Sequence, residues 1–174
     1  MKLLTTTLIL LFFTIIGFAQ ETYYGFRAGL NYSTLNFDSN DDDVDGRYGL
    51  VVGGFIDHEF SEKLSLLAEL QYSAEGAKQR ELRADYIQLP LMLRYKIGEW
   101  FKVGLGPQGA IKVWSHEDGF QNVVFSGVAG IEYMFTDELF FDLRYSFGLS
   151  DVLDDEIPLD ARNNYVQLGF GIKL

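Results

Sequence analysis

The sequence predicts an all-β fold, namely an eight-stranded antiparallel up-and-down transmembrane β-barrel. Two observations carry this prediction. About eight segments alternate large apolar residues with small or polar ones, and a period of two indicates a strand because successive side chains point to opposite faces of a sheet. The connections between these segments are alternately short and long, as in bacterial outer-membrane barrels.

The N-terminal segment, residues 1–19, is expected to be a secretory signal peptide cleaved after Ala19. It carries one positive charge at Lys2, followed by an apolar run over residues 8–16, which is the order of parts in such signals. A membrane-spanning helix needs about 20 apolar residues, and this run is about half as long. We therefore expect one mature domain, an outer-membrane β-barrel formed by residues 20–174.

The first four strands are expected from alternating apolar residues, with one exception. In the second strand residues 50–52 are all apolar, so its phase cannot be assigned. Pro90 falls in the middle of the fourth strand, and we expect a local distortion there because proline removes a donor from the ladder. The expected strands are 23–33 (Tyr24, Phe26, Ala28, Leu30, Tyr32), 47–58, 64–75 (Leu64, Leu66, Ala68, Leu70, Tyr72) and 84–97 (Ile87, Leu89, Leu91, Leu93, Tyr95).

The last four strands follow the same rule. In the fifth and sixth the small residues identify one face, and the eighth shows the clearest alternation of the whole chain. The expected strands are 101–112 (Gly104, Gly106), 123–135 (Ser126, Gly130), 139–150 (Leu139, Phe141, Leu143, Tyr145, Phe147, Leu149) and 164–174 (Val166, Leu168, Phe170, Ile172, Leu174).

The connections suggest an orientation. Outer-membrane barrels have short periplasmic turns and longer outside loops, so both termini are expected on the periplasmic side. The short connections are 60–63, 98–100 and 136–138, and the long ones are 34–46, 76–83, 113–122 and 151–163.

The second face of the strands decides between a membrane barrel and a soluble lipocalin-like barrel with an apolar pocket. Small residues suit the narrow interior of an eight-stranded barrel, whereas a water-facing exterior would carry more Lys and Glu. We therefore favour the membrane barrel. The small and polar residues of this face are Gly25, Gly29, Ser65, Gln71, Ser73, Gly104, Gly106, Ser126, Gly130, Ser146, Gly148, Gly169 and Gly171.

Charges of both signs share this inward face. An unpaired buried charge costs several kcal/mol, so these residues are expected to pair, either only to fill and stabilise the barrel or to plug its lumen. Lys96 and Lys102 lie on the same face. The predicted charge network of the lumen consists of Glu69, Glu132 and Asp142 facing Arg27, Arg94 and Arg144.

The first long loop contains a weak candidate for a calcium site. Asp41, Asp43, Asp45 and Gly46 copy the start of a calcium-binding loop, in which alternate carboxylates supply oxygen ligands and glycine allows the turn. The twelfth position should be Glu, but it is Val52. An acidic loop exposed to solvent is the simpler interpretation, and no other cofactor is expected.

Other motifs do not indicate catalysis. The glycines of residues 104–109 match a dinucleotide fingerprint in letters only, because the motif needs a following helix and here Pro107 interrupts a strand. His58 and His116 are expected at opposite ends of the barrel, so neither has the other as a catalytic partner. We see no nucleophile motif and expect no enzyme.

The charge of the chain disfavours nucleic acid as a partner. The formal net charge is −11, and removal of residues 1–19 leaves 13 basic and 25 acidic residues. Such a surface repels nucleic acid, and the sequence shows no basic patch that would reverse this. The chain has no cysteine, so stability must come from barrel closure and burial.

Five phrases occur in the order typical of one family. They are Phe26-Arg27-Ala28-Gly29-Leu30-Asn31, Leu70-Gln71-Tyr72-Ser73-Ala74-Glu75-Gly76, Tyr86-Ile87-Gln88-Leu89-Pro90-Leu91, Gly106-Pro107 and Leu143-Arg144-Tyr145-Ser146-Phe147-Gly148-Leu149. Together they resemble the PorT-like outer-membrane β-barrel family of Bacteroidetes. The resemblance implies an outer-membrane location and an eight-stranded barrel, and its link to secretion or gliding is not carried over to this chain. The final Leu174 is atypical, since such barrels often end in an aromatic residue.

The sequence therefore predicts a non-enzymatic barrel in the Gram-negative outer membrane, with a plugged polar lumen and a structural or interaction role through acidic extracellular loops. The expected partners are outer-membrane lipids, the barrel-assembly machinery during biogenesis and an extracellular or periplasmic protein. Three alternatives stay open. They are a small passive channel, a soluble lipocalin-like ligand-binding barrel, and a lipid-modifying enzyme, for which no polar catalytic cluster is visible.

Overall fold

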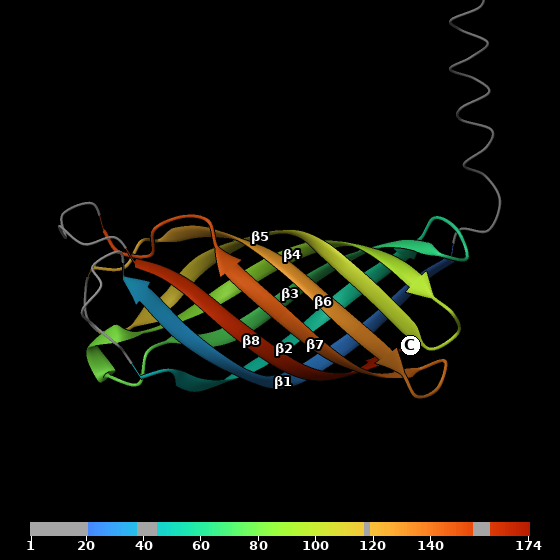
Figure 1. The fold of residues 1–174 in the computed structure, drawn as a ribbon, viewed down its shortest axis with the longest axis horizontal. Coiled ribbons are helices and arrows are strands. Elements are labelled where there is room, and N and C mark those ends of the chain that lie inside the picture. Colours follow the sequence, from blue (N-terminus) through green and yellow to red (C-terminus); the bar gives the residue numbers. More distant parts are fainter. Residues whose placement is uncertain (1–20, 38–44, 117–118, 155–160) are drawn as a thin grey trace, which may run out of the picture.

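The protein forms a closed barrel of eight antiparallel strands connected in sequence order, and β1 pairs with β8 to complete the circle (Figure 1). The computed structural model describes residues 21–37, 45–116, 119–154 and 161–174. This confirms the predicted fold class. The strands are β1 (Glu21–Phe37), β2 (Arg47–Glu59), β3 (Leu64–Gly76), β4 (Arg83–Ile97), β5 (Phe101–Ser115), β6 (Val123–Met134), β7 (Leu139–Gly148) and β8 (Ala161–Lys173).

Among the described residues outside the strands, one 3₁₀ turn, Arg80–Leu82, lies between β3 and β4. Within the described ranges, no helix has the length and apolar character needed to cross a membrane. The expected signal peptide lies outside the described residues.

Strand boundaries agree with the sequence to within two residues, except that β5 continues to Ser115 instead of residue 112 and that β1 and β8 are longer at the seam between them. β1 continues to Phe37 instead of ending near residue 33, and β8 begins at Ala161 instead of residue 164. The added residues pair with each other, Phe37 opposite Ala161. The apolar alternation changes phase here, because Tyr32 is outward and Leu35 is inward, so the pattern of the first strand ends before its ladder does.

The phase of the second strand is now assigned. Leu50 and Val52 are 65% and 54% exposed, whereas Val51 and Phe55 are buried at 1% and 4%. Two inward positions of β2 are therefore apolar themselves. The alternation was invisible in the sequence because both faces of the strand carry hydrophobic side chains at this point.

The apolar face of the barrel points outward on every strand. Large hydrophobic residues such as Leu30, Leu105, Leu143 and Leu168 are each 45% exposed or more. A lipocalin-like barrel would need the opposite arrangement, with these residues lining an internal pocket. The wall instead presents an apolar surface to its surroundings, as lipid requires.

Pro90 interrupts the ladder between β3 and β4 without changing its register. Between β3 and β4, Ala68 pairs with Leu91 and Gln71 pairs with Gln88, so two positions between them are unpaired while the register is unchanged. The register shift lies elsewhere, between Asp85 and Tyr86 in the pairing of β4 with β5. The expected distortion at Pro90 is therefore a gap in the ladder.

The two ends of the barrel differ (Figure 1). The short connections 60–63, 98–100 and 135–138 lie at one end, and the described chain both begins at Glu21 and ends at Leu174 there. The longer connections lie at the other end. We refer to these as the turn end and the loop end.

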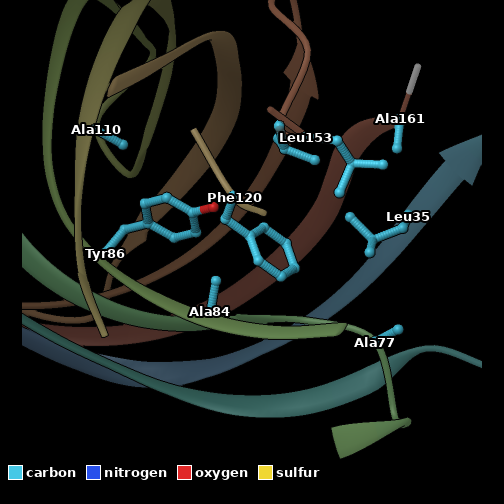
Figure 2. Packing of buried hydrophobic residues seen from close by; sticks show 9 residues of the cluster. Leu35, Ala77, Ala84, Tyr86, Ala110, Phe120, Leu153 and Ala161 are labelled. Atoms are coloured by element: carbon cyan, nitrogen blue, oxygen red, sulfur yellow. The ribbon is translucent and has the colours of Figure 1, made fainter. Parts of the chain in front are cut away.

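A hydrophobic cluster closes the loop end, and Figure 2 shows its side chains turned toward one another. The third and fourth long connections pair across the opening, where Gln121 N donates to Val152 O and Asp154 N donates to Gly119 O, both at 2.9 Å. This pairing places loop side chains against residues of the strands. The buried members of this cap are Leu35, Ala77, Ala84, Tyr86, Ala110, Phe120, Val152, Leu153 and Ala161.

Candidate functional site in the barrel interior

The inward positions of the strands place charged side chains in two layers below the cap. The layer nearer the middle of the barrel, the central ion cluster, consists of Arg27, Glu69, Asp142 and Arg144. The layer toward the turn end, the turn-end ion cluster, consists of Asp57, Glu59, Arg94, Lys102, Glu132 and Lys173. All six residues of the predicted lumen network lie in these two clusters, and each is at most 4% exposed.

The central ion cluster is a closed set of contacts between two arginines and two carboxylates. Arg27 binds Asp142 in a bidentate manner, with its Nε and Nη2 atoms each 2.6 Å from a carboxylate oxygen. Arg144 Nη1 donates to Glu69 Oε2 at 2.6 Å, and Arg144 Nε lies 3.3 Å from Asp142 Oδ1. The cluster is neutral, so no buried charge is left without a counter-charge.

Glycines on neighbouring strands make room for the arginine side chains. A Cβ atom added to Gly169 would lie 2.5 Å from Arg27 Nε. Added Cβ atoms at Gly104 and Gly130 would lie 2.8 Å from the Cγ atoms of Arg94 and Arg144. These positions therefore relieve crowding inside the barrel, as the sequence suggested for Gly104.

The turn-end ion cluster joins three cations to three carboxylates. Arg94 contacts Asp57 through Nη2, and its Nη1 lies 2.7 Å from Glu132 Oε2. Lys102 Nζ lies 2.9 Å from Glu59 Oε1 and 3.4 Å from Asp57 Oδ2. Lys173 Nζ completes the set at 3.6 Å from Glu132 and 3.9 Å from Asp57. This cluster is neutral as well.

The sequence missed part of this second cluster for an identifiable reason. Asp57 and Glu59 lie on β2, whose phase could not be assigned, so their inward direction was unknown. Lys102 was placed on the inward face but was not included in the network, and Lys173 follows the inward glycines Gly169 and Gly171 on the same face of β8. Lys96, predicted on the same face, is only partly buried near the turn end.

A layer of amide side chains arranged around one carboxylate, Glu75, separates the central ion cluster from the cap. Gln71 links the two, because its Oε1 accepts from Arg27 Nη1 at 3.2 Å and its Nε2 donates to Gln88 Oε1 at 2.7 Å. Gln88 Nε2 and Asn163 Nδ2 each donate to the carboxylate of Glu75 at 2.6 Å. Hydrogen bonds thus continue from the charged layers to the cap.

Only part of the candidate calcium site lies within the described residues. Asp41 and Asp43 lie outside the described residues. Asp45 is exposed, and its Oδ2 lies 3.2 Å from Lys78 Nζ. The described part of the chain contains no group of three His, Cys, Asp or Glu side chains placed to hold a metal ion. The calcium site stays a prediction.

The two histidines lie at opposite ends of the barrel. His58 Nδ1 is 2.8 Å from Thr22 Oγ1 near the turn end. His116 lies at the loop end, where its backbone N donates to Arg83 O at 3.1 Å. No proton can pass directly between the two imidazoles in this arrangement.

Comparison with known families decides the class of protein. The family model described as "outer membrane protein beta-barrel domain" matches residues 18–154. The chain belongs to this family. No curated protein sequence matches it. For an outer membrane β-barrel, the exposed apolar wall faces lipid, and the layers of polar side chains fill the space that the wall encloses.

Solved structures of outer membrane β-barrels share the fold. Ail, the attachment invasion locus protein of Yersinia pestis, is 14% identical with a TM-score of 0.54, and the match covers 88% of this chain and 99% of Ail. Neisserial surface protein A is 13% identical with a TM-score of 0.54, over 90% of this chain and 99% of that protein. At these identities the likeness concerns the fold alone, and the PorT-like resemblance stays a prediction.

Proposed function

We propose that this outer membrane β-barrel is a closed, non-conducting and non-enzymatic protein with a structural or interaction role. The observation that carries the proposal is the charge-paired interior. Two neutral ion clusters, an amide layer and a hydrophobic cap occupy successive levels of the barrel between the turn end and the loop end.

Little space remains between the charged side chains. A cavity among Arg94, Lys102, Glu132 and Arg144 has a volume of about 10 Å³, which is about the room that one water molecule needs. Moving an ion through this level would require breaking contacts between buried charges. Leaving one such charge unpaired costs several kcal/mol of free energy.

Electrical recording tests the closed state. Purified protein, folded in detergent and inserted into planar bilayers, is expected to give no steady conductance above that of a protein-free detergent blank. Folding of the same sample is checked by the mobility of unheated protein on a gel. A large and steady single-channel conductance would contradict the proposal and favour the alternative of a small passive channel.

We propose that the loop end faces the outside of the cell and that both termini are periplasmic. The support is the difference between the two ends, since outer membrane barrels have short turns on the periplasmic side and longer loops outside. The acidic loops, including Asp151 and Asp154, then face outward and present the surface available to an extracellular partner.

Labelling of intact cells tests this orientation. A cysteine introduced at Glu81, in the connection between β3 and β4, is expected to react with a membrane-impermeant maleimide. A cysteine at Glu99, in the turn between β4 and β5, is expected to react only after the outer membrane is permeabilised. Neither result is confused by native thiols, because the chain has no cysteine. The reverse pattern would place the termini outside.

A further inference from the structure

The outer wall carries a pocket at the loop end, next to the strands β1 and β2. Its volume is about 540 Å³. Tyr32 and Tyr48, which are opposite each other in the ladder, project outward beside it with ring centroids 4.9 Å apart. The residues that line the pocket are Tyr32, Asp45, Gly46, Arg47, Tyr48, Lys78 and Arg83.

The lining has more positive than negative charge. Lys78 Nζ lies 3.2 Å from Asp45, and Arg47 Nη1 lies 3.3 Å from Asp85. Arg83 is different, because within the described ranges no carboxylate pairs with it. Its Nη2 donates to Lys78 O at 2.8 Å, and its Nε is buried with no hydrogen-bond partner. Among the described residues, the pocket therefore contains one guanidinium group without a counter-charge.

This positive charge stands out against the rest of the chain. The formal net charge of the protein is −11, yet residues 78–83, which run from the connection after β3 to the first residue of β4, carry Lys78, Arg80 and Arg83 against Glu81. These cations are spread over six residues, and the pocket gathers two of them with Arg47 from β2. The patch is not apparent from the sequence, because Arg47 joins Lys78 and Arg83 only in the folded barrel.

The position of the pocket on the barrel wall indicates which part of the bilayer it contacts. Tyr48 is 79% exposed and Tyr32 is 41% exposed on the apolar wall near its loop end. Tyrosines at this level of an outer membrane barrel lie at the boundary between the hydrocarbon and the headgroups. A cationic pocket beside them faces lipid headgroups, which are the part of the bilayer that carries phosphate.

We propose that this pocket binds the phosphate of an anionic lipid in the leaflet at the loop end. Arg83 and Lys78 donate to the phosphate oxygens, and the phosphate supplies the counter-charge that Arg83 lacks among the described residues. Charge-assisted hydrogen bonds of this kind are among the stronger polar contacts in proteins. The exposed faces of Tyr32 and Tyr48 pack against the apolar part of the lipid. This inference does not depend on whether the barrel conducts.

Lipid binding to the folded full-length protein tests the proposal. The protein in zwitterionic detergent is titrated with phosphatidic acid, with phosphatidylcholine and with inorganic phosphate, and bound species are counted by native mass spectrometry. Phosphatidic acid is expected to bind more tightly than either of the other two. The Arg83→Gln variant is expected to bind phosphatidic acid about tenfold more weakly, as loss of one charge-assisted contact predicts.

Arg80→Gln is the matched control. It removes the same charge from the same connection, but Arg80 does not line the pocket, so phosphatidic acid binding should change less than about twofold. Lys78→Gln, at an exposed position, should weaken binding in the same direction as Arg83→Gln. Unheated gel mobility verifies that each variant is folded.

Three outcomes would overturn the proposal. Unchanged binding of phosphatidic acid by the Arg83→Gln variant would show that the pocket is not the binding site. Equal weakening by Arg80→Gln and Arg83→Gln would indicate general attraction to the basic connection and no defined site. Inorganic phosphate that binds as tightly as phosphatidic acid would identify a site for the free anion and not for a lipid.

Discussion

Replacing Asp142 with alanine is expected to lower the free energy of unfolding by about 3–5 kcal/mol. Asp142 is 2% exposed and holds Arg27 through two contacts of 2.6 Å. Without it the central ion cluster contains two arginines and one carboxylate, so one positive charge stays buried without a partner. Equilibrium unfolding in urea, followed by fluorescence of the barrel in lipid vesicles, measures the change.

Two further variants separate the cost of an unpaired charge from the value of the pair. Lys78→Ala breaks the pair with Asp45, whose side chains are 71% and 74% exposed, and should cost less than about 1 kcal/mol. The double variant Arg27→Met with Asp142→Leu removes both charges together and should recover much of the stability lost in Asp142→Ala. If Asp142→Ala costs no more than Lys78→Ala, the interior is hydrated and the ion cluster is not a dry plug.

Replacing Leu168 with arginine is expected to lower the free energy of unfolding by about 2–4 kcal/mol. Leu168 lies on the outward face of β8, between Leu30 of β1 and Leu143 of β7 in the two ladders. It is therefore near the middle of the wall, where an arginine would have to enter hydrocarbon. Unfolding in urea from lipid vesicles measures the effect, because the lipid must be present for the cost to arise.

Leu149 provides the matched control. It is 61% exposed and follows the end of β7 at the loop end of the barrel. The Leu149→Arg variant places the same side chain near the interface, where the cost falls to about 0–1 kcal/mol. Equal effects of the two substitutions would show that the wall does not lie across a bilayer at the depth proposed.

The sequence predicted most of the barrel because the two faces of its strands differ in chemistry. Where they do, as in β8 with Leu168 outside and Gln167 inside, periodicity assigns both the strand and its direction. Where the two faces do not differ, periodicity cannot assign which side chains point inward. Val51 and Phe55 are apolar and inward, so the phase of β2 was lost, and with it the place of Asp57 in the turn-end ion cluster.

The cap could not be predicted by the same reasoning. Phe120 and Leu153 come from two long connections that have no regular period, and they pair with each other only because the barrel brings those connections together. The cationic pocket has the same origin, since Arg47 and Arg83 belong to different strands. Local patterns reveal elements, whereas contacts between distant connections depend on the closed geometry of the whole barrel.

The pairing of β1 with β8 has a consequence for biogenesis. The free edge of β1 finds its partner only after the last strand has been synthesised and exported, since Arg27 lies opposite Gly171. Until then an open edge of backbone donors and acceptors is exposed, and such an edge invites pairing with other chains. The bond between Arg27 and Asp142, 115 residues apart, also forms late. We therefore expect nascent chains to need protection from self-association until the barrel closes.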